Sequence, residues 1–211
     1  MKQFLLIISF LTFVFAINLQ AQSIVFQEDF EGTTLGLTSS STGAGVWALN
    51  SRVQSQGLKS DSSVVAVSDI NYLTTDAFST IGKYSVYLEF DQICKTSFRD
   101  GGYIEVSNDN GLTWTRVIGA AGIYLGTGSF GTWGNQFNGG SYALWDLSTP
   151  NAVPLNTWWK TELFDISTYA ANATNVKIRF ALADGILGVP GPEGCAGWFI
   201  DSITVNASVS E

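Results

Sequence analysis

Short runs in which apolar and polar residues alternate recur along most of this chain, and they constrain its fold more than any other feature. The clearest run covers 84–93. Because residues two apart on a β-strand share a face, one face of this run is expected in the core and the other in water. The expected core face carries Val86, Leu88 and Phe90, and the solvent face carries Tyr87, Glu89 and Asp91.

Clusters of Gly, Ser, Asn and Asp separate these runs, and no segment keeps helical periodicity over three turns. The chain is therefore predicted to be all-β. Many antiparallel strands with long connections favour a two-sheet jelly-roll sandwich of the concanavalin A-like kind. The last strand presents one apolar face only if it bends near Asp201. The expected strands and core segments are 24–30, 64–67, 84–93, 103–107, 114–118, 158–165, 176–183 and 197–205.

The N-terminus predicts export. A predominantly apolar run from Phe4 to Ile17 follows Lys2, and a short polar stretch then ends at Ala21. The run is shorter than the roughly 20 residues that a spanning helix needs, so no membrane insertion is expected. We interpret 1–21 as a signal peptide and 22–211 as a single secreted jelly-roll domain, a size that one all-β core can fill.

Charge and composition exclude several functions. The chain has 10 Lys and Arg against 18 Asp and Glu, so its net charge of −8 disfavours a nucleic-acid partner. It contains no histidine, which removes histidine-dependent triads, histidine metal sites and the commonest general base. Composition therefore points away from most enzymes.

Cys94 and Cys195 are the two cysteines. In an exported chain the natural expectation is one disulfide between them. The alternative is a pair of buried free thiols that behave as small apolar residues.

Three motifs together carry a family resemblance. They are the segment 28–32 (EDFEG), the segment 103–114 (YIEVSNDNGLTW) and the segment 197–203 (GWFIDSI). The chain resembles the MAM-like or choice-of-anchor jelly-roll modules of secreted bacterial proteins, which are similar to the module attached to immune-inhibitor-A-type metallopeptidases. The resemblance implies that the first and last motifs lie on neighbouring strands and hold a structural cation. The family commonly has two successive aspartates in the last motif, whereas Ser202 takes the second position here.

A structural calcium ion needs several hard oxygen ligands. Glu31 and Asp201 are the best pair, because the resemblance brings their strands together, and Asp29 and Asp61 are further candidates. The alternative is that these carboxylates cap turns or lie solvated at strand ends.

The segment 107–114 also resembles an Asp-box. Asp109 is expected to accept backbone N–H groups across a tight hairpin, Gly111 to take a positive φ, and Trp114 to pack beneath the turn. The motif predicts a hairpin and says almost nothing about function.

Glu89 and Asp91 give the sharpest enzyme hypothesis, because two carboxylates on one strand face serve retaining glycosidases on jelly-roll folds. The laminarinase-like pattern requires another Glu a few residues on, where Gln92 to Lys95 stand instead. A partner would have to be Glu105 or Glu162. The alternative is a solvated or salt-bridged strand face.

The segment 119–154 combines eight glycines with six aromatic residues and is too long for an ordinary loop. Flat aromatic rings rimmed with amides bind sugar rings, so one interpretation is a glycan site. The alternative is a satellite core in which the aromatics fold back onto the sandwich. The predicted ligand-binding residues are Trp133, Tyr142 and Trp145, with Asn135 and Gln136 as polar partners.

Taken together, the sequence predicts a secreted, noncatalytic adhesion or binding module at a bacterial cell surface, with a structural Ca²⁺. Its expected partner is an extracellular glycan or a surface protein. The alternatives are a glycan-active hydrolase that uses Glu89 or Asp91, and a spacer or accessory domain of a larger secreted protein.

Overall fold

A computed structural model describes residues 22–65, 67–185, 188–192 and 194–209, so the expected signal peptide lies outside the described residues. The regular structure of the described chain is almost all strand, with one short helix, α1 (Ser167–Ala170), and the 3₁₀ turns η1 (Gly131–Trp133), η2 (Ala143–Trp145) and η3 (Asn156–Trp158). The strands are β1 (Ser23–Glu28), β2 (Leu37–Ser41), β3 (Trp47–Asn50), β4 (Ser60–Ser63), β5 (Ile70–Thr75), β6 (Ser85–Lys95), β7 (Gly101–Ser107), β8 (Thr115–Arg116), β9 (Lys160–Asp165), β10 (Lys177–Ala183) and β11 (Gly197–Ser208).

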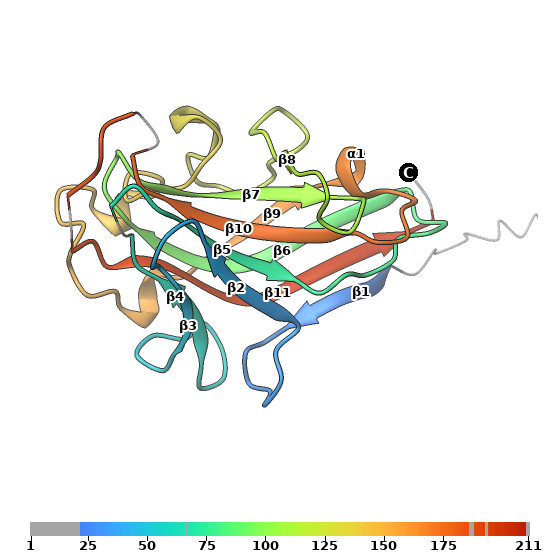
Figure 1. Cartoon of the computed structure of the whole chain (residues 1–211), viewed down its shortest axis with the longest axis horizontal. Coiled ribbons are helices and arrows are strands. Elements are labelled where there is room, and N and C mark those ends of the chain that lie inside the picture. The colour runs from blue at the N-terminus through green and yellow to red at the C-terminus, as the bar shows by residue number, and fades with distance from the viewer. Residues whose placement is uncertain (1–21, 66, 186–187, 193, 210–211) are drawn as a thin grey trace, which may run out of the picture.

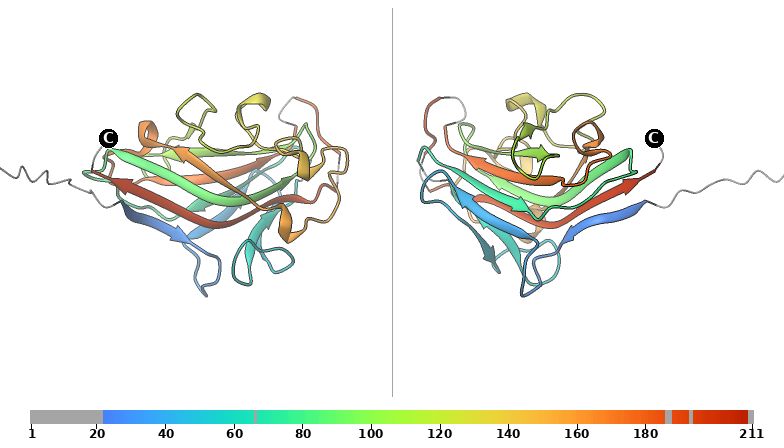
Figure 2. Two further views of the ribbon diagram at one scale, coloured as in Figure 1. Left: turned by 180° about the vertical axis from the view of Figure 1, so that it is seen from behind. Right: turned by 45° about the vertical axis from the view of Figure 1, so that its right-hand side comes forward.

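Two antiparallel sheets form a sandwich, as predicted. The six-stranded sheet has the order β3-β4-β11-β6-β9, with β1 also paired to β11, and the five-stranded sheet has the order β2-β5-β10-β7-β8. Figure 1 looks onto the five-stranded sheet, and the view from behind in Figure 2 looks onto the six-stranded sheet. The neighbouring position of the first and last strands, which the resemblance implied, is confirmed by the β1–β11 ladder.

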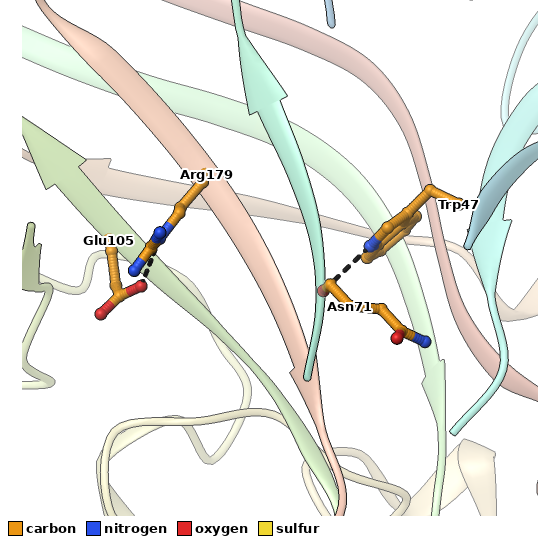
Figure 3. A network of polar contacts seen from close by, with 4 residues as sticks. All are labelled: Trp47, Asn71, Glu105 and Arg179. Atoms are coloured by element: carbon orange, nitrogen blue, oxygen red, sulfur yellow. Dashed lines mark hydrogen bonds and ion pairs between the residues drawn. The ribbon is translucent and has the colours of Figure 1, made fainter. Parts of the chain in front are cut away.

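Aromatic side chains fill the space between the sheets. The Phe90 ring of β6 lies 5.0 Å from Phe180 of β10, and Phe180 lies 5.9 Å from Trp198 of β11. Each fully buried ring of this kind contributes about 1.5–3 kcal/mol by leaving water. Trp47 also lies in this core and donates its indole N–H to the Asn71 carbonyl at 3.1 Å (Figure 3), so its polar atom is satisfied.

The last strand contains the predicted bend. Asp201 of β11 pairs with Asp91 of β6, whereas Thr204 pairs with Glu89, so β11 has one extra residue at this point. Such a β-bulge interrupts the alternation of side chains. Ser202 takes a φ of 52° within the bulge. The bulge therefore keeps the apolar residues on both sides of it in the core and turns Asp201 and Ser202 toward the outer face.

The glycine-rich segment 119–154 covers one edge and one end of the sandwich, along the top and at the left of Figure 1. It pairs with β9 through a Tyr124–Phe164 bridge and with β7 through a Gly102–Phe137 bridge. Phe130 and Phe137 are completely buried, with their ring centroids 4.7 Å apart. This arrangement is the satellite core that the sequence left open as an alternative.

The turn at 107–114 has the hydrogen bonds expected from its sequence. Asp109 Oδ1 accepts the Thr113 N–H at 2.9 Å and the Ser107 hydroxyl at 2.6 Å, and these bonds lower the pKa of Asp109 to about 2. Asn110 and Gly111 both have positive φ values, of 64° and 89°. The segment therefore forms a tight turn between β7 and β8.

One predicted core segment is wrong. Val64 and Val67 were expected to be buried, but they are 58% and 55% exposed. The strand in this region is β4, which consists of Ser60–Ser63 and lies just before them. Polar side chains fill β4 because their hydroxyls bond to backbone carbonyls on either side of β3, as Ser63 does with Val46 at 2.8 Å and Ser60 with Val53 at 2.7 Å.

The expected disulfide is also wrong, because Cys94 and Cys195 are both free and buried. Each thiol donates a hydrogen bond to a different carbonyl. Cys94 donates to Phe137 O at 3.3 Å and Cys195 to Pro192 O at 3.4 Å. Burial raises the pKa of both thiols, that of Cys94 to about 12, so they are protonated at neutral pH.

Candidate functional site

A cleft of about 380 Å³ opens on the outer face of the six-stranded sheet. Its floor is formed by β11, β6 and β9, and its walls are the β1–β2 and β3–β4 connections, which project from the same side of the molecule in Figure 1. It is lined by Gln27, Asp29, Glu31, Gln56, Gly57, Glu89, Asp91, Thr161, Ser202 and Thr204.

Strand β6 supplies the carboxylates on the floor. Alternation places Glu89 and Asp91 on the solvent side of this strand, as predicted. Asp91 is only 8% exposed and accepts hydrogen bonds from the hydroxyls of Ser55 and, at 2.6 Å, Thr161. Glu89 is exposed, and its carboxylate has no hydrogen-bond partner among the described residues. One carboxylate is therefore held in place, and the other is available to a ligand.

The walls are tied together by Glu31. Its Oε1 accepts the backbone N–H groups of Leu58 and Lys59, both at 2.7 Å, and so joins the β1–β2 connection to the β3–β4 connection. Gly57 is required at this point, because it has a φ of +63° and a Cβ there would lie 2.5 Å from Glu31 Oε1. The shape of the cleft is therefore fixed by hydrogen bonds in the protein itself.

Asp201 lies behind the same wall. Its carboxylate accepts N–H groups from Ser55 at 2.8 Å and from Ser202 at 2.7 Å, and burial raises its pKa. Asp61 does not line the cleft. It is 3% exposed on β4, where it accepts the Ser62 N–H, and burial raises its pKa to about 7.

The four carboxylates predicted to bind calcium do not form a ligand set. Within the described parts of the chain, no group of three or more acidic or cysteine side chains is arranged to hold a metal ion. Glu31, Asp201 and Asp61 accept backbone N–H groups, and the Asp29 carboxylate accepts the Glu31 N–H at 3.0 Å. These contacts correspond to the capping alternative, and a structural calcium stays a prediction.

A second cleft of about 270 Å³ continues the first along β6, because both share Glu89 as a lining residue. Tyr87 and Leu163 lie in this part, together with Gln22 and Asn206. We call the two clefts together the β6 groove. Sequence reasoning placed Tyr87 on the solvent face but did not assign it a role. The available signal was an aromatic residue in line with two outward carboxylates.

The other carboxylates proposed for hydrolysis lie elsewhere. Glu105 forms an ion pair with Arg179 at 2.6 Å on the five-stranded sheet. Glu162 is completely buried and accepts hydrogen bonds from Tyr124 and Tyr142 at 2.6 and 2.8 Å, and burial raises its pKa. The carboxylates that do join Glu89 and Asp91 in the cleft come from the predicted calcium set, namely Asp29 and Glu31.

The residues predicted to bind a glycan in 119–154 are mostly used by the fold. Trp145 is completely buried and donates its indole N–H to Trp158 O at 2.9 Å. A ring without exposed surface cannot stack on a sugar, so Trp145 does not form the predicted platform. Gln136 is also buried and Tyr142 half-buried, Asn135 accepts the Gly119 N–H at 2.7 Å, and the Trp133 side chain lies outside the described part of the structure.

Comparisons with known proteins find similarity in fold. In sequence, neither a family model nor a curated protein matches it. The structure is similar to the CBM22-1 xylan-binding domain from Paenibacillus barcinonensis Xyn10C, with a TM-score of 0.51 and 12% identity over 91% of this chain and 99% of that one. It is also similar to the tandem CBM22-1–CBM22-2 domain of Xyn10C, with a TM-score of 0.50 and 13% identity over 92% of this chain and 48% of the tandem.

These solved structures are β-sandwich carbohydrate-binding modules, and the shared fold agrees with the predicted class. At this level of identity the likeness concerns the fold. The MAM-like assignment stays a prediction. No helix among the described residues is long and apolar enough to cross a membrane.

Proposed function

We propose that this protein is a secreted, noncatalytic glycan-binding module and that the β6 groove is its binding site. The observation that carries the proposal is the line of Tyr87, Glu89 and Asp91 along one open face of the sandwich. Sugar recognition needs planar polar groups for hydroxyls and an aromatic ring for the apolar face of a pyranose. The groove offers both within one strand.

Hydrogen bonds within the protein fix some of the polar side chains of this groove. Asp91 is held by hydroxyls of two other elements, and Glu31 is held by two backbone N–H groups of the opposite wall. Fixed polar groups bind with a smaller loss of conformational entropy than mobile ones. Glu89 and Gln56 are exposed in the same cleft and can adjust to the hydroxyls of a sugar.

Charge indicates which sugars the groove accepts. Among the residues that the structure describes, four carboxylates and no basic side chain line the larger cleft. Such a surface repels uronic acids and sulfated sugars and favours neutral or cationic ones. The similarity of fold to a xylan-binding domain supports glycan binding as the function.

Hydrolysis is the second candidate, because the structure adds Asp29 and Glu31 to the cleft that already holds Glu89 and Asp91. A retaining or inverting mechanism requires two carboxyl groups on opposite sides of one glycosidic bond. We prefer binding, since Asp91 is held by the hydroxyls of Ser55 and Thr161, and the walls use Glu31 to fix their own backbone. Secretion and a place at the bacterial surface are parts of the proposal that need separate tests, and unfolding of Asp201→Ala in calcium and in chelator tests the predicted structural calcium.

A glycan array of neutral, amino and acidic oligosaccharides tests the function. Glu89→Gln is compared with Asp76→Asn, which alters an exposed carboxylate outside the groove. We expect binding of neutral or amino sugars that falls at least about tenfold in Glu89→Gln and is unchanged in the control. The absence of binding to every glycan would refute the proposal, and release of new reducing ends would identify a hydrolase instead.

A further inference from the structure

The outer face of the five-stranded sheet differs from the β6 groove in both charge and composition. Arg116, Lys177 and Arg179 are the basic residues on this face, and Glu105 is the one acidic residue at its outward strand positions. The chain as a whole has a net charge of −8, so this concentration of positive charge is local. Three aromatic rings lie among these cations. We call the set Tyr72, Tyr103, Trp114, Arg116, Lys177 and Arg179 the arginine face.

The guanidinium group of Arg179 is held in a fixed orientation. Its central carbon lies 4.2 Å from the ring centroids of both Tyr72 and Trp114. Its Nε–H donates to Glu105 Oε2 at 2.6 Å, and Figure 3 shows the two side chains meeting between the neighbouring strands β10 and β7. Contacts of this kind remove the conformational freedom that a long side chain otherwise loses on binding.

One edge of this guanidinium remains open. Among the described residues, the two Nη groups of Arg179 have no hydrogen-bond partner, and the side chain is 20% exposed. A guanidinium can bind a carboxylate through two parallel N–H···O bonds. Because Glu105 occupies the Nε side, the pair of Nη groups is the edge that a ligand carboxylate would take.

The neighbouring residues extend the surface. Arg116 lies over the Tyr103 ring at 3.9 Å and directly opposite Glu105 in the β7–β8 ladder. Lys177 lies two residues from Arg179 on the same face of β10. Tyr103, Ala181 and Ala183 form a small apolar cluster beside Tyr72. The face therefore combines aromatic surface, positive charge and a preset donor pair.

We propose that the arginine face is a second binding site, selective for acidic sugars of the hexuronic acid class. The uronate carboxylate would pair with the Nη groups of Arg179, while the sugar ring contacts Tyr72 or Trp114. This proposal rests on glycan binding as the function of the protein, but it concerns the opposite sheet and the opposite sign of charge. The two faces would then select different parts of a mixed polysaccharide.

Titration calorimetry with a 1,4-linked galacturonate trimer and the corresponding neutral galactose trimer tests the proposal. We expect the acidic trimer to bind and the neutral trimer to bind at least about tenfold more weakly at this face, with affinity for the acidic trimer falling as salt rises. Arg179→Gln should reduce the affinity for the acidic trimer about tenfold or more. Arg52→Gln, which removes an exposed arginine of the β3–β4 connection, should leave it unchanged.

Two further variants keep the test decisive if Arg179→Gln fails to fold. Arg179→Lys retains the charge but loses the bidentate donor pair and should still weaken binding, and Lys177→Gln should weaken it through charge alone. The two trimers are compared in Tyr87→Ala, which should weaken binding in the β6 groove at least about tenfold and leave the affinity for the acidic trimer unaffected. Equal binding of both trimers by this variant, no binding of the acidic trimer, or full affinity of Arg179→Gln for the acidic trimer would each overturn the proposal.

Discussion

Asp201 accepts a hydrogen bond from the backbone N–H of Ser55 at 2.8 Å, across 146 residues of sequence. This contact anchors the β3–β4 connection to the bulge in the last strand. It explains why an aspartate follows GWFI in the final motif without any need for a metal ion. The wall of the β6 groove therefore depends on a carboxylate that lies outside the groove.

Asp201→Ala should lower the free energy of unfolding by about 2–3 kcal/mol, because it leaves backbone N–H groups in a buried place without their acceptor. Denaturant unfolding measures this loss, with Asp76→Ala, at an exposed carboxylate outside the groove, as control. We expect the same loss in calcium and in chelator. A loss seen only in calcium would establish a bound ion and contradict the capping role.

The raised pKa of Asp61 predicts how the free energy of unfolding depends on pH. Burial raises its pKa to about 7 in the folded protein, against 3.8 for an ordinary aspartate, so the folded state holds this proton more tightly. The stabilisation is present in full below pH 4 and is lost as the pH rises through about 7, by as much as about 4 kcal/mol. Asp61→Asn should flatten this part of the profile. Parallel melting profiles of the two proteins between pH 4 and 8 would refute the assignment.

Tyr124 links segment 119–154 to the sandwich. Its hydroxyl donates to the buried Glu162 at 2.6 Å and accepts the Gly128 N–H at 2.7 Å. Tyr124→Phe should therefore cost about 2 kcal/mol of unfolding free energy, whereas Tyr84→Phe, at a ring that is 51% exposed, should cost almost nothing. Urea unfolding of the two variants compares them directly. Equal stability would show that the hydroxyl does not hold this segment.

The burial of both cysteines predicts how they react with a thiol reagent. Both thiols are buried and free, so a thiol reagent should label neither in the native protein and both after unfolding. A reducing agent should not change the melting temperature. Mass spectrometry of the unreduced protein that found a peptide linked through Cys94 and Cys195 would contradict the structure and restore the disulfide.

The fold was predictable where alternation is strong. The expected runs at 84–93 and 176–183 correspond to β6 and β10, because each has one predominantly apolar face. The strands β2, β3, β4 and β5 were missed. LTSSS and SDSS carry no apolar alternation, and the buried face of β5 carries Asn71 and Thr75 beside Leu73. Tertiary context, which local sequence does not contain, decides such segments.

The sequence predicted individual residues of the candidate site but not how they come together. The sequence identified Glu89 and Asp91 as outward carboxylates and Glu31 as a residue near the last motif, but it assigned them to different functions. They meet in one cleft because β1 and β6 both pair with β11. The sequence of 119–154 did not predict which of its aromatic residues are buried, because aromatic content does not distinguish an exposed platform from a satellite core.

The most direct test of the central claim is the affinity of Tyr87→Ala for the glycan that binds best on the array, measured by titration calorimetry beside Tyr84→Ala. Tyr87 lines the β6 groove, whereas Tyr84 is an exposed tyrosine just before β6 and outside the groove. We predict a loss of about tenfold or more for Tyr87→Ala and unchanged affinity for Tyr84→Ala, with equal melting temperatures. Full affinity in Tyr87→Ala would show that the protein does not bind glycans in this groove.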